Sequence, residues 1–428
     1  MKQIAILVSG SGTNAEKIIQ YFAGSDKANV SVVISDNSSA YALTRAQNLG
    51  VEALALSRAD FRNGVRPLAE LRKRNIDLVI LAGFLSLVPK SLIEAYPNRI
   101  INIHPALLPK FGGKGMYGDR VHSAVIAAGE KESGITIHTI DEQFDRGTII
   151  AQFTTPVEEG DTPDTLATKI HALEHAHFPS VIESIVDKIT VMDNQKRLLL
   201  ISNSTTAGEP YLKYPIGNIE AFLKGVKEVA FVPYAAVTFS YDAYEAKVQE
   251  RFDEIGIKVR SIHRDADPAE TIRRAEAICV GGGNTFALLK KMHEQGVVEA
   301  IREKVEAGTP YVGWSAGSNV CCPTICTTND MPIVQPASFA AVNAVKFQIN
   351  PHYLDTHPEG HAGETREQRI QEYIEANDGM WVAGLREGCM LLVENGTMQL
   401  IGVRPMRMFR RGTETFEVNP GDDLSFLL

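Results

Sequence analysis

Three side chains suited to acyl chemistry follow apolar runs in the first half of the chain. Asn102 and His104 come just after the run at residues 99–101, and Asp145 follows a second run at residues 134–140. When an amine attacks a formyl carbon, the carbonyl oxygen becomes an oxyanion that needs hydrogen-bond donors already in place. We expect Asn102 and a protonated His104 to donate to that oxygen, while Asp145 keeps the imidazole charged and orders a proton-carrying water. Taken singly, each residue is more common as a cap, a packed histidine or a loop carboxylate.

A glycine-rich turn nearer the amino terminus has the outline of a phosphate site. It lies between an apolar run at residues 3–8 and residues 15–22, whose spacing is helical. Unpaired N–H groups at the start of a helix lie at the positive end of its dipole, where a phosphate binds well. The turn also fits a dinucleotide fingerprint, with Asp36 ending the next strand, so NAD binding is the alternative interpretation. The turn consists of Ser9, Gly10, Ser11, Gly12, Thr13 and Asn14.

Two segments, residues 102–109 and 141–147, resemble the signatures of phosphoribosylglycinamide (GAR) formyltransferase, the folate-dependent enzyme of purine biosynthesis. The resemblance covers residues 1–188. It implies a Rossmann-like domain in which the amide, imidazole and carboxylate described above are catalytic. It also implies 10-formyltetrahydrofolate as the co-substrate, with no metal. Formyl transfer to another amine, such as a sugar nucleotide or a charged tRNA, is the alternative.

The same resemblance assigns further residues to the substrates. The glycine-rich turn would hold the ribotide phosphate with Arg58 as a second contact, and Glu174 would contact the ribose hydroxyls. Residues 110–117 are expected to form a loop on the substrate side. His171 and His175 lie one helical turn apart, but Glu174 is not where the zinc motif H-E-x-x-H requires it, so we interpret them as surface or packing histidines. Folate would lie against Phe84, Leu85, Ser86, Leu87, Val88, Ile140 and Asp141.

In the second half, Ser315 stands in a short string of small residues after a strand-like run at residues 311–313. The string, Gly-Trp-Ser-Ala-Gly, fits a nucleophile elbow, in which a tight turn exposes the serine hydroxyl. The N–H of Ala316 can form half of an oxyanion hole, and Gly282 or Gly283 can supply the other half. A junction of small residues between a strand and a helix is the alternative interpretation.

Partners for this serine follow later in the chain. His352 can take the Ser315 proton, and Glu387 can hold the imidazole. The order Ser-His-Glu differs from the Ser-acid-His order of α/β-hydrolases, which favours a different fold with a convergent triad.

From about residue 197 onward, the second half resembles peptidase E, an aspartyl dipeptidase of the class I glutamine-amidotransferase-like group. The resemblance implies metal-free hydrolysis of dipeptides that begin with aspartate. We expect Arg366 to pair with the side-chain carboxylate of the substrate, because a guanidinium fork matches that geometry. An ion pair between Arg366 and Glu364 or Glu367 is the alternative. The resemblance rests on residues 281–286, 327–334 and 358–366.

Length and composition predict a multidomain globular enzyme. The chain has 428 residues, of which 44% are hydrophobic and 22% charged, and its formal charge is −9. This length exceeds one ordinary core, so two or three domains are expected. The negative charge argues against nonspecific nucleic-acid binding, and no apolar run is long enough to span a membrane. The five cysteines are odd in number, and the amino terminus has no signal-peptide pattern, so we expect a cytoplasmic protein without disulfides.

A polar join at residues 190–196 separates the two halves, and Met192 stands where an independent protein would begin. We therefore predict a GAR formyltransferase domain at residues 1–190 and a peptidase E-like serine dipeptidase domain at residues 193–428, working independently. Apolar runs alternate with helical stretches in both halves. This alternation predicts an α/β fold with two doubly wound, mostly parallel sheets, and the resemblance to peptidase E implies that the second is of the flavodoxin type.

The sequence as a whole predicts a bifunctional enzyme that acts on small molecules, with no nucleic-acid or membrane partner. The alternative is an active formyltransferase joined to an inert or assembly-only module.

Overall fold

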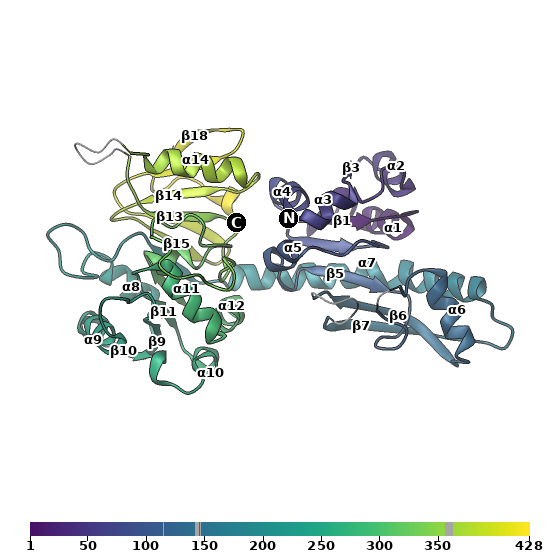
Figure 1. Ribbon diagram of the computed structural model, residues 1–428, viewed down its shortest axis with the longest axis horizontal. Helices are drawn as coiled ribbons and strands as arrows, with labels where there is room; N and C mark the ends of the chain where they lie inside the picture. The colour runs from purple at the N-terminus through teal and green to yellow at the C-terminus, as the bar shows by residue number, and fades with distance from the viewer. Residues whose placement is uncertain (114, 142–144, 146, 356–362) are drawn as a thin grey trace. The chain divides into compact units, whose positions relative to one another are not determined.

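A single helix, α7 (Pro163–Gln195), carries the chain from its first folding unit into its second. The units are Met1–Thr190 and Val191–Leu428 (Figure 1). The structure is a computed structural model, and it describes residues 1–113, 115–141, 145, 147–355 and 363–428. Since α7 passes through the boundary without a break, the join that we expected at residues 190–196 is helical as far as Gln195.

A seven-stranded sheet with the order β3-β2-β1-β4-β5-β6-β7 is the centre of the first unit. The first five strands in that order pair in parallel. β6 pairs antiparallel with β5, and β7 pairs antiparallel with β6. In β1, Ile4 and Ile6 are buried on one face of the sheet, and Ala5 and Leu7 on the other. A strand buried on both faces is a continuous apolar run in the sequence. The strands are β1 (Lys2–Val8), β2 (Ala28–Ser35), β3 (Glu52–Ala55), β4 (Leu78–Leu81), β5 (Ile100–His104), β6 (Glu132–Thr139) and β7 (Ile149–Pro156).

Helices cover both faces of this sheet (Figure 1). Side chains of α1, α2, α6 and α7 belong to the same buried cluster as Ile4, and side chains of α3, α4 and α5 to that of Ala5. In α1, buried Ala15, Ile18 and Phe22 recur at helical spacing, which gives the helix one apolar face. The helices are α1 (Thr13–Phe22), α2 (Tyr41–Asn48), α3 (Arg58–Asn63), α4 (Val65–Lys73), α5 (Lys90–Ala95) and α6 (Asp119–Ala127).

The second unit repeats this plan with a seven-stranded sheet of order β10-β9-β11-β12-β8-β15-β16. Its first five strands are parallel, and β15 and β16 add an antiparallel edge. In β8, Leu198 and Leu200 are buried on one face, and Leu199 and Ile201 on the other. The strands are β8 (Leu198–Ile201), β9 (Glu228–Val232), β10 (Lys258–Ser261), β11 (Ile278–Val280), β12 (Tyr311–Trp314), β15 (Met390–Glu394) and β16 (Thr397–Ile401).

A separate four-stranded sheet, β13-β14-β17-β18, completes the second unit. The α/β class with two mostly parallel sheets is confirmed, whereas this additional sheet was not expected from the sequence. Over the described part of the chain, no helix is long and apolar enough to cross a membrane. The remaining elements are β13 (Gln348–Tyr353), β14 (Val382–Arg386), β17 (Met406–Arg410), β18 (Thr413–Val418), α8 (Ile216–Phe222), α9 (Tyr241–Phe252), α10 (Pro268–Arg274), α11 (Thr285–Glu294), α12 (Val297–Glu306), α13 (Ala316–Asn319) and α14 (Arg366–Ala376).

Candidate active sites

A cavity of about 580 Å³ lies where β1, β4 and β5 end. These strands are parallel neighbours, so their carboxyl ends meet at one edge of the sheet, where ligands bind in open α/β folds. The glycine-rich turn, the segment after β4 and the end of β5 all line the cavity. The predicted site residues that line it are Gly10, Ser11, Gly12, Thr13, Asn14, Phe84, Leu85, Ser86, Leu87, Val88, Asn102, His104, Ile140, Asp141, Asp145 and Glu174.

Asp145 lies between the other two predicted catalytic residues. Its Oδ1 is 3.5 Å from Nδ2 of Asn102, and its Oδ2 is 3.7 Å from Nδ1 of His104. The same Oδ2 accepts a hydrogen bond from the Gly113 N–H at 2.9 Å, which holds the carboxylate in this position. The structure therefore brings the amide, the imidazole and the carboxylate together. Residues 142–144 and 146 of the predicted motif lie outside the described residues.

The loop that carries Asp145 approaches the end of β6 very closely. A Cβ atom at Gly147 would lie 1.8 Å from the carbonyl oxygen of Thr139, so only glycine permits this approach. The N–H of Thr148 donates to the Thr139 hydroxyl at 2.9 Å, which ties the loop to the strand. These contacts hold residues 147 and 148, which follow Asp145 in the chain, against the end of β6.

His104 is buried, and its ring has a defined orientation. Only 3% of the residue is exposed, and Nε2 lies 2.8 Å from the carbonyl oxygen of Phe111. Because a carbonyl only accepts, Nε2 carries a proton and donates it. The other ring nitrogen, Nδ1, consequently faces Asp145 and the cavity.

His138 is part of this cluster, although nothing in the pattern of neighbouring residues singles it out. It lies opposite Asn102 in the β5–β6 pairing, and the Asn102 amide nitrogen is 3.1 Å from Nε2 of His138. Its Nδ1 donates to the Thr139 carbonyl at 2.6 Å, which leaves Nε2 as an acceptor. Burial lowers the pKa of His138 and favours this neutral form. A histidine inside an apolar strand usually packs, so its role as the acceptor for Asn102 had no signal in the sequence.

Glu174, on α7, closes another side of the cavity. It is 5% exposed, and its Oε2 accepts hydrogen bonds from the Asn14 amide at 2.8 Å and from Nδ1 of His171 at 3.0 Å. The bond to Glu174 raises the pKa of His171. The His171 side chain is 56% exposed, as expected of a surface histidine, and it also lines the cavity. Its ring stacks on that of His175, with a distance of 6.3 Å between centroids.

Two predicted phosphate contacts, Ser9 and Arg58, are not among the described residues that line the cavity. The Ser9 hydroxyl accepts the Leu85 N–H at 2.9 Å and therefore supports the segment after β4. Arg58 has a 69% exposed side chain, and its Nε lies 3.5 Å from Oδ2 of Asp36. Ser86 donates to the same Asp36 oxygen at 2.5 Å. Protein side chains thus contact Oδ2 of Asp36, whereas its Oδ1 is buried without a hydrogen-bond partner among the described residues.

The predicted substrate-side loop at residues 110–117 does reach the cavity, through Gly113 and residues 115–117. Lys114 lies outside the described residues. Arg120 and His122, which follow on α6, also line the cavity, and sequence analysis missed both. Their only signal was their proximity to this loop in the chain.

In the second unit, the three predicted catalytic residues form one hydrogen-bonded chain. Nε2 of His352 lies 3.0 Å from Oγ of Ser315, and Nδ1 lies 2.7 Å from Oε1 of Glu387. Ser315 directly follows β12 and has φ 54° and ψ −112°, the strained turn of a nucleophile elbow. The side chains of His352 and Glu387 are 38% and 39% exposed. The geometry suits transfer of a proton from the serine hydroxyl to the imidazole.

Small residues make the elbow possible. A Cβ atom at Gly317 would lie 2.1 Å from the carbonyl oxygen of Val280 on β11, so α13 can approach the sheet only with glycine there. Ala316 begins α13, directly after the serine. Gly282 and Gly283 follow β11, and a Cβ atom at Gly282 would lie 3.0 Å from that of Ser315. Ala316 and Gly282, two of the predicted oxyanion-hole residues, thus lie next to the nucleophile.

Arg366 begins α14 and is half-buried. Burial lowers the pKa of Arg366, while the nearby charge of Asp330 opposes that shift. The proposed alternative partners are engaged elsewhere: Glu364 lies 3.7 Å from Arg369, and Glu367 lies 3.1 Å from Arg407. Over the described residues, Arg366 itself forms no hydrogen bond or ion pair. Residues 358–362 of the predicted motif are outside the described part of the chain.

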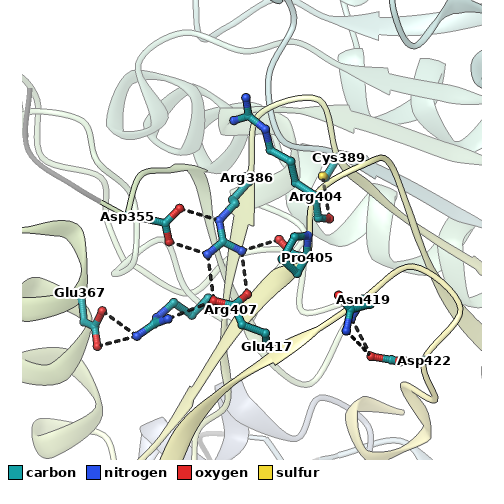
Figure 2. Close-up of polar contacts among 10 residues, drawn as sticks. All are labelled: Asp355, Glu367, Arg386, Cys389, Arg404, Pro405, Arg407, Glu417, Asn419 and Asp422. Carbon is teal, nitrogen blue, oxygen red and sulfur yellow. Dashed lines mark hydrogen bonds and ion pairs between the residues drawn. The ribbon is translucent and has the colours of Figure 1, made fainter.

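The segment that carries Glu387 is anchored by its neighbour Arg386 (Figure 2). The Arg386 guanidinium donates to both oxygens of Asp355 and both oxygens of Glu417, and to the carbonyl of Pro405. Hydrogen bonds to Glu417 and Asp355 raise the pKa of Arg386, and Arg386 in turn lowers the pKa of each carboxylate. Arg407 extends the network from Glu417 at 3.0 Å. These contacts join the ends of β13 and β14 to β18.

Comparison with known proteins identifies two families in the same order as the two sites. The formyl transferase family matches residues 2–182, and peptidase family S51 matches residues 198–401. Peptidase E from Nostoc sp. is 50% identical over 234 residues, which are 54% of this chain and 97% of that protein. Peptidase E from Streptomyces coelicolor is 47% identical over 232 residues, which are 54% of this chain and 94% of that protein.

Among solved structures, phosphoribosylglycinamide formyltransferase from Bacillus halodurans is similar to the first half. The sequence identity is 39% and the TM-score 0.41, over 44% of this chain and 96% of that one. The predicted fusion of a formyltransferase with a peptidase E-like protein is confirmed by the two family matches. The chain therefore belongs to both families, to the formyl transferases through residues 2–182 and to peptidase family S51 through residues 198–401.

Proposed function

We propose that the chain is a bifunctional enzyme that formylates GAR with 10-formyltetrahydrofolate and hydrolyses dipeptides that begin with aspartate. The first activity is supported by the meeting of Asn102, His104 and Asp145 in one cavity with the glycine-rich turn. The second is supported by the hydrogen bonds that link Ser315, His352 and Glu387. The named similar proteins are a phosphoribosylglycinamide formyltransferase and two peptidases E, in agreement with this pair.

In formyl transfer, attack by the ribotide amine places negative charge on the formyl oxygen and positive charge on the attacking nitrogen. One N–H of the Asn102 amide is held by His138, and the remaining N–H donates to the formyl oxygen. A protonated His104 adds a second donor through Nδ1. Asp145 accepts the proton from the attacking nitrogen through a water and delivers it to the leaving nitrogen as the old C–N bond breaks.

The lining of the cavity fits the two substrates in chemical character. The N–H groups of residues 10–14 and the cation Arg120 suit a phosphate, and buried Glu174 suits the hydroxyls of a ribose. Leu85 and Leu87 line the same cavity while remaining 49% and 55% exposed. Exposed apolar side chains at a cavity suit a flat ring system such as a pterin.

In the second site, Ser315 transfers its hydroxyl proton to Nε2 of His352 as Oγ attacks the peptide carbonyl. Glu387 holds the Nδ1 proton and stabilises the imidazolium that forms. The N–H groups of Ala316 and of Gly282 or Gly283 receive the oxyanion. His352 then protonates the leaving amine, and a water activated by the same imidazole releases the acyl group from Ser315.

Arg366 supports the preference for aspartate at the amino terminus of the substrate. A half-buried cation without a hydrogen-bonding partner among the described residues is costly to keep desolvated, and a carboxylate relieves that cost. The same reasoning predicts that a substrate with an uncharged amide in place of the carboxylate is a poor one.

A paired assay of the intact protein tests both halves of the proposal. We expect His104→Ala to lower kcat/KM for GAR formylation at least about 1,000-fold and Ser315→Ala to do the same for Asp-Leu hydrolysis. Each variant should retain the other activity within about twofold, and so acts as the control for the other. A panel of other amines, including a sugar nucleotide amine, tests the choice of acceptor. Absence of either activity in the wild-type protein would refute that half.

A further inference from the structure

The last residue of β8 and the residue after it contact the backbone of the triad at several points. The Ile201 carbonyl accepts the Ser315 N–H at 3.0 Å. The hydroxyl of Ser202 accepts the His352 N–H at 3.0 Å and donates to the Leu385 carbonyl at 2.7 Å. Ser202 is fully buried, so water cannot replace it in these two bonds. One hydroxyl group therefore bridges the strand of His352 and the strand that leads to Glu387.

The His352 N–H donates to the Ser202 hydroxyl, because the pairing of β13 with β14 is irregular at this residue. β13 pairs with β14 regularly at Asn350 and again at Tyr353, with an irregularity between these positions. His352 lies inside the irregularity with φ 52°, a left-handed conformation that non-glycine residues rarely adopt. Such a conformation persists only where the surroundings hold it. The Ser202 hydroxyl is the group that holds this N–H.

Glu387 is positioned by the same segment. It occupies a tight turn in which the Cys389 N–H bonds to the Arg386 carbonyl at 3.2 Å and Gly388 has φ 81°. The side-chain oxygen of Asn203, the residue after Ser202, accepts the Gly388 N–H at 2.9 Å. The turn is therefore attached to the end of β8 on one side, while the network around Arg386 holds the other side (Figure 2).

The side chains of the acid–base pair receive little support from packing. Those of His352 and Glu387 are 38% and 39% exposed, so their rotamers are not confined by a close-packed interior. The separation of their backbones decides whether the imidazole can reach both Ser315 and Glu387. That separation is set where the Ser202 hydroxyl joins the two strands.

We propose that Ser202 is a positioning residue of the peptidase site, whose hydroxyl keeps the His352 backbone in register with the segment that carries Glu387. The inference rests on the proposed dipeptidase activity and deepens it. Ser202 does not touch the reacting atoms and acts only through His352 and Glu387. Losing the hydroxyl should therefore impair the chemical step more than substrate binding.

The test compares Ser202→Ala with Ser261→Ala in the full-length protein. Ser261, on β10, is also a buried serine, with its hydroxyl 2.6 Å from Nδ1 of His263, and so it controls for the loss of a buried hydroxyl. For Asp-Leu hydrolysis, we expect Ser202→Ala to lower kcat about 10- to 100-fold and to leave KM within about twofold. The rate at which a fluorophosphonate labels Ser315 should fall in parallel. Ser261→Ala should keep both rates within about twofold.

Folding and the proposed function are checked separately. Circular dichroism and the thermal midpoint report whether each variant folds. If Ser202→Ala does not fold, Ser202→Cys takes its place, because a thiol fills a similar volume but hydrogen-bonds weakly, and the same fall in kcat is expected. A folded Ser202 variant with an unchanged kcat and labelling rate would overturn the inference, as would an equal loss in Ser261→Ala. Lack of hydrolysis by the wild-type protein would instead refute the dipeptidase assignment.

Discussion

At the scale of single residues, the formyl-transfer site depends on which nitrogen of each histidine carries a proton. His104 donates from Nε2 to a backbone carbonyl, while His138 donates from Nδ1 and accepts at Nε2. The first arrangement turns Nδ1 of His104 toward Asp145. The second fixes the Asn102 amide with its nitrogen toward His138. Both orientations are set by main-chain carbonyls rather than by the catalytic residues themselves.

Replacing His138 by phenylalanine removes the acceptor that orients Asn102. We expect His138→Phe to lower kcat for GAR formylation about 10- to 100-fold, with KM for the ribotide little changed. The amide would then keep only its longer contact with Asp145, at 3.5 Å, and its second N–H would no longer be directed at the formyl oxygen. Steady-state kinetics measure the effect, and dipeptide hydrolysis by the same variant is the internal control. An unchanged kcat would show that Asn102 needs no support from His138.

The lowered pKa of His138 also predicts a pH dependence of stability. Burial lowers this pKa below its ordinary value of 6.5, so just below pH 6.5 the unfolded chain binds the proton more readily than the folded one. Stability then rises with pH in that window and falls as the pH is lowered through it. Urea unfolding at pH 7 and pH 5 should show a smaller acid-induced loss in His138→Phe than in the wild-type protein. If both proteins lost the same stability between pH 7 and pH 5, His138 would be excluded as the source of the acid-induced loss.

Residue types and spacing predicted the two trios that the fold brings together, but not the groups that support them. Asn102, His104 and Ser315 stood out because they follow apolar runs, and strand ends meet at one edge of a sheet. His138 and Ser202 did not, since a histidine within a strand and a serine after one are common in ordinary packing. Their roles depend on partners far away in the chain, such as Ser202 with His352, and these distances exist only in the folded protein.

At the scale of elements, continuous apolar runs predicted the central strands well. The apolar run at residues 3–8 lies in β1 (Lys2–Val8), and the strand-like run at residues 311–313 lies in β12 (Tyr311–Trp314). The sheet β13-β14-β17-β18 was missed, because strands such as β17 and β18 interleave charged or polar residues with apolar ones instead of forming continuous apolar runs. The join expected at residues 190–196 is helical as far as Gln195, which its sequence did not indicate. Polar residues without glycine or proline extend a helix as readily as they form a linker, and α7 continues through them to Gln195.

The missed sheet depends on its ion-pair network (Figure 2), so Arg386→Met should destabilise the protein. We expect a loss of about 1–3 kcal/mol at pH 7, below the range for a fully buried pair, because the Asp355 and Glu417 side chains are partly exposed. Urea unfolding measures this loss. Arg260→Met removes an exposed ion pair with Asp265 and should cost less than about 1 kcal/mol.

The ion pairs of Arg386 also determine how the stability of the protein changes with pH. Arg386 lowers the pKa of Asp355 and of Glu417 below their ordinary values of 3.8 and 4.5. The stabilisation by these ion pairs is therefore complete at a pH above the ordinary pKa values. It is lost as the pH falls through the lowered pKa values of the folded protein. The difference between the wild-type protein and Arg386→Met should shrink as the pH is lowered toward 3. A difference that stays constant with pH would assign the effect to packing rather than to charge.

At the scale of the whole molecule, each unit has its own sheet, its own buried core and its own candidate site. The last turn of α7 belongs to the second unit. A Cβ atom at Gly308 would lie 3.1 Å from the carbonyl oxygen of Gln195, and one at Gly396 would lie 2.4 Å from Oδ1 of Asn194. These close approaches place the division of the chain before Asn194, inside a helix rather than in a loop.

Separate fragments test the independence of the two activities. We expect fragments 1–190 and 191–428 to fold on their own, with kcat for formylation and for dipeptide hydrolysis within about threefold of the intact chain. The two fragments mixed together serve as the control for any effect of association. A fragment that folds but loses its activity, and regains it in the mixture, would show that the sites depend on each other.

The exposure of His352 and Glu387 decides which nucleophile ends the peptidase reaction. Their side chains are 38% and 39% open to solvent, so bulk water reaches the imidazole while the aspartyl group is still attached to Ser315. In the proposed reaction, this exposure favours release of the aspartyl group to water as a free amino acid over its transfer to a second peptide.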